Sequence, residues 1–102
     1  MELNEAFGRA LKALRTRRNL THLRFFGSTS RTYMSLLEHG GRCPTIAKIS
    51  DLSDVLEVHP VSLLVECYLQ KHPEMDLDWL FERIRKDLAL DLSEPLNKSE
   101  DH

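Results

Sequence analysis

The stretch Ser30–Gly40, which reads SRTYMSLLEHG, holds the pattern that decides the fold. It follows Gly27-Ser28-Thr29, residue types that are common in turns. After Ser30, either Tyr33 or Met34 lies on the same helical face as Leu37. Gly40 and the glycine after it supply the left-handed conformation that commonly closes a helix. We therefore predict a short helix in this stretch, with a tight turn at each end.

A second short helix is predicted immediately before the first. Thr21 is its candidate cap and Gly27 ends it. Its apolar positions are Leu23, Phe25 and Phe26. Two short helices joined by a tight turn form the geometry that lets a protein place one helix in the major groove of DNA. This part of the chain is therefore a candidate DNA-binding element.

Apolar residues at helical spacing predict four further helices, and no segment shows a strand pattern. Asn4 is the candidate cap of the first helix and Thr45 that of the fourth. Pro60 suits the first position of the fifth, and Asp76 or Asp78 caps the sixth. The fourth helix carries an apolar stripe that we expect in the core: Ile46, Ile49, Leu52, Val55 and Leu56. The predicted helices cover residues 4–17, 21–27, 31–38, 45–56, 60–69 and about 76–88.

Length and composition limit the chain to one globular domain with an appendage. It has 102 residues, of which 41% are hydrophobic and 29% charged. No apolar run is long enough to span a membrane and the start carries no secretion signal, so we expect a cytoplasmic protein. Neither Cys43 nor Cys67 sits in a zinc-ligand or disulfide pattern, and we expect no metal and no cofactor. The expected fold is all-α, with a domain over residues 1–70 and a C-terminal helix and polar tail over residues 71–102.

The charges are distributed unevenly between the two halves of the chain. Residues 1–50 contain nine Lys and Arg against three Glu, a net charge of +6. Residues 51–102 contain five basic residues against thirteen acidic ones, a net charge of −8. A basic half that binds a polyanion and an acidic half that stays away from it would explain this distribution. The alternative is that both halves carry ordinary solvated faces.

Several short motifs at matching spacing resemble the lambda-repressor-like helix-turn-helix family, also called XRE or Cro-type. The resemblance covers residues 4 to about 66, and it departs from the family at HLRFFG, residues 22–27, where the family usually has a longer second helix. The fold it implies is a five-helix DNA-binding domain, here followed by an additional amphipathic helix. The matching motifs are Leu20-Thr21, Ser30 to Ser35, Leu37 to Gly40, Pro44 to Ile46, Leu52, Val55 to Pro60 and Leu63-Leu64.

The resemblance implies that double-stranded operator DNA is the partner and that the helix after the turn reads it. Arg31 is the expected base reader, because its guanidinium can donate two hydrogen bonds to guanine; the alternative is a phosphate or water contact. Glu38 is expected to be structural and to bond back to Arg15 or a neighbour. The candidate DNA-binding residues are Thr21, Ser30, Arg31, Thr32, Ser35, Arg42, Arg15 and Arg18.

The C-terminal helix is the candidate interface for a second copy or for a protein partner. Its apolar stripe could instead fold back on the domain, and both can hold together. We expect a dimeric repressor that reads a palindromic operator, because one module of this size contacts little DNA. The alternative is an antitoxin-like or anti-activator protein; no catalytic grouping occurs, so we expect no enzyme. The interface candidates are Leu77, Trp79, Leu80, Phe81, Ile84 and Leu88.

Overall fold

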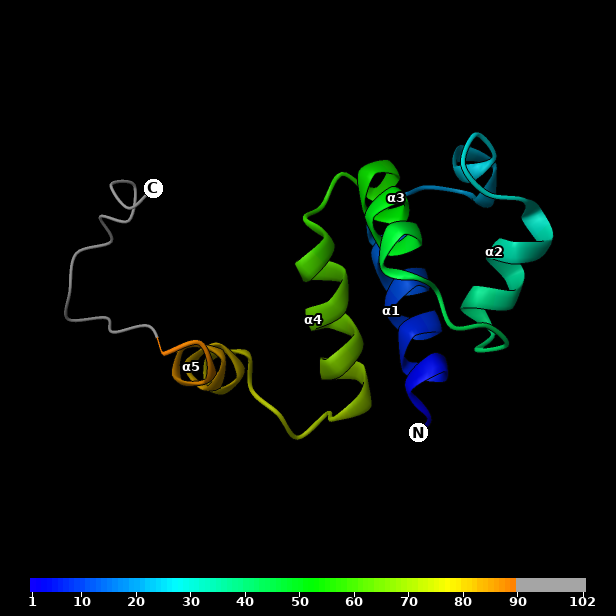
Figure 1. Ribbon diagram of the computed structural model, residues 1–102. Coiled ribbons are helices and arrows are strands. Elements are labelled where there is room, and N and C mark those ends of the chain that lie inside the picture. The colour runs from blue at the N-terminus through cyan, green and yellow to red at the C-terminus, as the bar shows by residue number, and fades with distance from the viewer. Residues whose placement is uncertain (90–102) are drawn as a thin grey trace, which may run out of the picture.

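The computed structural model describes residues 1–89, and along this part the chain forms five α-helices, one short 3-10 helix and no strand (Figure 1). The expected all-α architecture is confirmed for these residues. The predicted polar tail, Ser93–His102, lies outside the described residues. The elements are α1 (Leu3–Arg17), η1 (His22–Phe25), α2 (Arg31–Glu38), α3 (Ile46–Leu56), α4 (Pro60–Lys71) and α5 (Leu77–Asp87).

Local capping explains where three of the helices begin. The Ser30 hydroxyl accepts a hydrogen bond from the backbone N–H of Tyr33 at 3.1 Å. The Thr45 hydroxyl accepts one from the backbone N–H of Lys48 at 3.0 Å. The Asp76 carboxylate accepts from the backbone N–H of Asp78 at 3.1 Å, which decides between the two predicted caps in favour of Asp76. Pro60 occupies the predicted first position of α4. These starts were correctly predicted because each depends on a few adjacent residues.

Two predicted caps are wrong. Helix α1 already begins at Leu3, with Glu2 at the capping position, so Asn4 lies inside the first turn. Thr21 precedes η1 in an extended conformation, but its side chain makes no capping hydrogen bond. Neither residue contributes the side-chain cap expected of it.

Helix α1 organises the core, with α4 on one side and α2 on the other; α3 packs on α4 (Figure 1). Burial raises the pKa of the Cys67 thiol, as expected for a packed rather than a reactive cysteine. Ile46 was predicted to be buried but is 86% exposed, because the first turn of α3 extends past the core. The buried apolar residues are Ala6, Phe7, Ala10, Leu11, Phe25, Met34, Leu37, Ile49, Leu52, Leu56, Leu63 and Cys67.

Gly8 brings the backbones of α1 and α2 into direct contact. A Cβ atom at this position would lie 2.5 Å from the carbonyl oxygens of both Leu37 and Glu38. Such a distance is far below any real carbon–oxygen contact, so only glycine allows α2 to lie this close to α1. The position of α2 therefore depends on Gly8.

The end of α3 stores backbone strain at Glu57, whose φ of 61° and ψ of 42° lie in the left-handed region. A residue with a Cβ pays about 1 kcal/mol for this conformation, which glycine adopts freely. We predict that Glu57→Gly raises the free energy of unfolding by about 1 kcal/mol in urea denaturation. Glu57→Ala is the matched control, because it removes the same carboxylate and keeps the strain. Equal effects of the two substitutions would contradict the strain.

Helix α5 lies against the outer side of α4 and buries none of its own residues. Leu80 and Ile84 are half-buried, while Leu77, Trp79, Phe81 and Leu88 are between 41% and 64% exposed. None of the helices within residues 1–89 combines the length and the apolar character that crossing a membrane requires.

Candidate functional site

The first turn of α2 presents a row of polar side chains to solvent. Ser30, Arg31 and Thr32 are exposed, and Ser35 one turn later is half-buried. Ser30 uses its hydroxyl as the helix cap, which fixes the direction in which α2 leaves the preceding turn. The structure therefore brings together the four residues predicted for the face of this helix.

Arg31 does not extend freely into solvent, because its guanidinium lies over the ring of Phe26 at 5.7 Å from the ring centre. Phe25, the preceding residue, is completely buried, and this anchors the turn that holds the Phe26 ring at the surface. A guanidinium that lies over an aromatic ring contacts the ring through its flat face. Its N–H groups point outward in the guanidinium plane, so they can still donate hydrogen bonds to a ligand. Sequence reasoning missed this use of Phe26; the pair of adjacent aromatic residues was the only signal.

Lys48 adds a positive charge that the sequence analysis did not single out. Its ammonium group donates to the carbonyl oxygen of Ser28 at 2.8 Å and lies 5.5 Å from the centre of the Tyr33 ring. These contacts join the start of α3 to the turn before α2 and to α2 itself. Lys48 therefore holds the turn in place and adds positive charge beside it.

Behind this surface, Glu38 at the end of α2 is held by two residues from other elements. Its carboxylate accepts two hydrogen bonds from Arg15, at 2.7 and 3.1 Å, and lies 3.1 Å from His22 Nε2. The Arg15 guanidinium also donates to the carbonyl oxygen of Leu20 at 2.9 Å. The cluster Arg15–His22–Glu38 thus ties α1, η1 and α2 together.

Burial alone would raise the pKa of Glu38, whose side chain is only 5% exposed. The hydrogen bonds and positive charge of Arg15, with the contact to His22, outweigh burial, so the pKa of Glu38 lies below its ordinary value of 4.5. Glu38 is therefore ionised at neutral pH and neutralises Arg15. The predicted bond from Glu38 back to Arg15 is confirmed.

This bond occupies the guanidinium of Arg15, which was a candidate phosphate contact. All three nitrogen atoms of the Arg15 guanidinium donate to protein oxygens, and the side chain is 16% exposed. Because the group is already neutralised and largely covered, we exclude Arg15 from the candidate surface.

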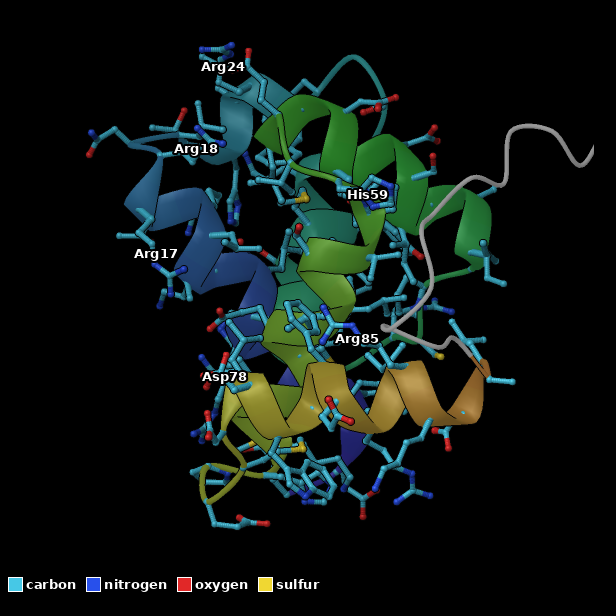
Figure 2. All side chains as sticks on the ribbon, turned by 90° about the vertical axis from the view of Figure 1, so that its left-hand side faces the viewer. Arg17, Arg18, Arg24, His59, Asp78 and Arg85 are labelled. Atoms are coloured by element: carbon cyan, nitrogen blue, oxygen red, sulfur yellow. The ribbon has the colours of Figure 1, made fainter. Side chains whose placement is uncertain are left out.

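The remaining predicted cations lie at two other places. Arg18 donates to the backbone carbonyl of Glu57 at 3.0 Å and so is tied to the end of α3 rather than to α2. In Figure 2 it lies with Arg17 and Arg24 where α1 ends and η1 begins; Thr21, between Arg18 and Arg24 in the sequence, is exposed. Arg42 is exposed in the connection after α2, and within the described residues it has no hydrogen bond or ion pair.

Residues 1–89 contain no group of three or more His, Cys, Asp or Glu side chains placed to hold a metal ion. No protein-family model, curated protein or solved structure matches this chain. What the chain does is therefore inferred from its own residues.

Proposed function

We propose that this protein is a sequence-specific DNA-binding transcriptional regulator that reads its operator through α2. We assign it the five-helix lambda-repressor-like fold, with η1 and α2 as the two helices of the helix-turn-helix. The observation that carries the proposal is the first turn of α2, where exposed Ser30, Arg31 and Thr32 stand on a helix that Gly8 and Glu38 hold in position. A rigid helix with short polar side chains and one arginine suits entry into a major groove.

The placement of the charges supports the same proposal. Arg31, Arg42 and Lys48 lie on α2 or on the segments that flank it. The excess of acidic residues falls in residues 51–102, although α4 and α5 each contain as many basic as acidic residues. A polyanion would therefore be attracted to one part of the molecule and repelled from the other.

The 3-10 helix η1 is the main difference from the family pattern. It has four residues, consistent with the predicted short second helix. Although η1 is short, it is held in position at two points: Phe25 is buried in the core and His22 contacts Glu38. These two contacts support η1 as the helix that holds the turn before α2.

The direct test is a fluorescence anisotropy titration with duplex fragments from the region upstream of the gene, beside a scrambled duplex of equal length. Arg31→Ala is expected to weaken binding to the specific fragment about ten- to hundredfold, because one bidentate base contact contributes about 1–3 kcal/mol. Arg9→Ala is the matched control, since Arg9 is an exposed arginine on α1, away from α2 and α5 in the sequence. Equal binding to both duplexes, or equal effects of both substitutions, would reject base reading by α2.

Arg42 gives a second prediction, because phosphate contacts determine how strongly affinity depends on salt. We expect Arg42→Ala to weaken binding to specific and scrambled duplexes alike and to lower the slope of log affinity against log salt by about 0.9. The same anisotropy titration at several salt concentrations measures this slope. An unchanged slope would show that Arg42 contacts no phosphate.

An antitoxin-like or anti-activator protein that acts through a protein partner is the second candidate function. The exposed aromatic residues Trp79 and Phe81 on α5 favour it, since such side chains commonly anchor protein interfaces. A stable complex with a co-encoded protein, together with no affinity for DNA, would support this alternative over the regulator.

A further inference from the structure

Two neighbouring helices leave apolar side chains uncovered within the described chain. Helix α5 buries no residue, and α4 exposes Val61 and Tyr68 on the side toward α5. Soluble proteins seldom leave a continuous apolar surface of this kind without a partner.

The geometry of the two helices explains why their apolar faces stay open. Both views show α5 lying across α4 rather than along it, so the ends of α5 extend past α4 (Figures 1 and 2). An apolar hollow lies on each side of the crossing, one beside Leu80 and Ile84 and the other beside Leu77 and Phe81. Val61 and Val65 of α4 line both hollows.

The charges along α5 are separated by sign. The acidic residues Asp76, Asp78 and Glu82 occupy its cap and first half. The second half contains three basic residues and one acidic residue: Arg83, Arg85, Lys86 and Asp87. Figure 2 shows Asp78 near one end of the helix and Arg85 farther along it. Two such helices attract each other when antiparallel and repel each other when parallel.

We propose that a second copy of this chain covers the α4–α5 face, with the two α5 helices antiparallel across a two-fold axis. The face is then complementary to itself in charge, as a two-fold interface requires. The exposed apolar side chains of α5 and α4 fill the hollows of the partner, with Trp79 and Phe81 as aromatic anchors. None of these residues lies in η1 or α2, so the dimer stands apart from the proposed DNA contact.

Molar mass measured by light scattering during gel filtration, without DNA, tests the dimer. The wild-type protein is expected at twice the mass of one chain. A variant with Asp78→Lys and Glu82→Lys makes α5 mainly basic, and a variant with Arg85→Glu and Lys86→Glu makes it mainly acidic. Each variant alone is expected at the mass of one chain, and an equimolar mixture is expected to restore the dimer.

The matched control is Asp51→Lys with Asp54→Lys, two exposed acids on α3 that give the same change in net charge as the basic variant. It is expected to remain dimeric. Because no residue of α5 is buried, circular dichroism is expected to show an unchanged helical signal in every variant. The equimolar mixture of the two α5 variants is expected to regain the dimer mass, so it tests the charge pairing by a gain of association rather than by a loss.

A wild-type protein at the mass of one chain would overturn the proposal. Dimers of either α5 variant alone, or dissociation of the α3 control, would also overturn it, because pairing would then not depend on the α5 charges. Failure of DNA binding would leave these masses unchanged, whereas a monomer that still binds DNA through α2 would refute the dimer alone.

Discussion

Glu38→Ala is expected to lower the free energy of unfolding by about 3 kcal/mol, because it leaves the largely covered charge of Arg15 without its partner. His22 loses the same carboxylate. Domains of this size have a total stability of only about 5–15 kcal/mol, so the change would be plain in urea denaturation. Glu5→Ala is the matched control, since Glu5 pairs with Arg9 at an exposed site. Equal effects of the two substitutions would contradict a structural role for the cluster.

The lowered pKa of Glu38 also predicts how stability depends on pH. A carboxylate whose pKa is lower in the folded than in the unfolded state stabilises the protein at pH values above its ordinary pKa of 4.5. This contribution is lost as the pH falls through the lower, folded-state pKa. The wild-type protein should therefore lose stability below pH 4.5 more steeply than Glu38→Gln, which carries no ionisable group there. Parallel pH profiles would contradict the role of the Glu38 carboxylate.

Gly8→Ala is expected to lower the free energy of unfolding by about 3 kcal/mol, because the added methyl group would overlap two backbone carbonyl oxygens of α2. The helices must separate to admit it, which also opens the core beside Leu37. Backbone atoms cannot move aside as a flexible side chain can. We therefore expect a displaced α2 and weaker DNA binding even at temperatures where the variant remains folded.

Gly27→Ala is the control for Gly8→Ala, since a Cβ at Gly27 would meet no atom within 4 Å. Its effect on the free energy of unfolding should be within about 0.5 kcal/mol. Urea denaturation measures both variants, and the anisotropy titration reports the position of α2. If Gly8→Ala behaved like Gly27→Ala, α1 and α2 would not meet through their backbones.

Features set by adjacent residues were predictable from the sequence. The starts of α2, α3 and α4 follow from Ser30, Thr45 and Pro60, whose roles involve the next few residues. The burial of Ile46 was predicted wrongly from periodicity alone. A helical repeat identifies which residues share a face, but it does not say how far along the helix the core extends.

Contacts between distant residues were less predictable. The resemblance correctly predicted the bond between Glu38 and Arg15, and this bond occupies the guanidinium that was also predicted to contact phosphate. The roles of Gly8, Phe26 and Lys48 escaped prediction altogether. Each depends on a neighbour that only the folded chain brings close.

If α2 reads DNA, the amide chemical shifts of its residues change when a specific duplex binds. A duplex selected from a random-sequence pool by binding to the full chain would be titrated into isotope-labelled protein. Large shifts are predicted for residues 30–35 and around Arg42, with small shifts in Leu77–Asp87. Selection that enriches no sequence, or shifts concentrated in Leu77–Asp87, would show that α2 does not read DNA.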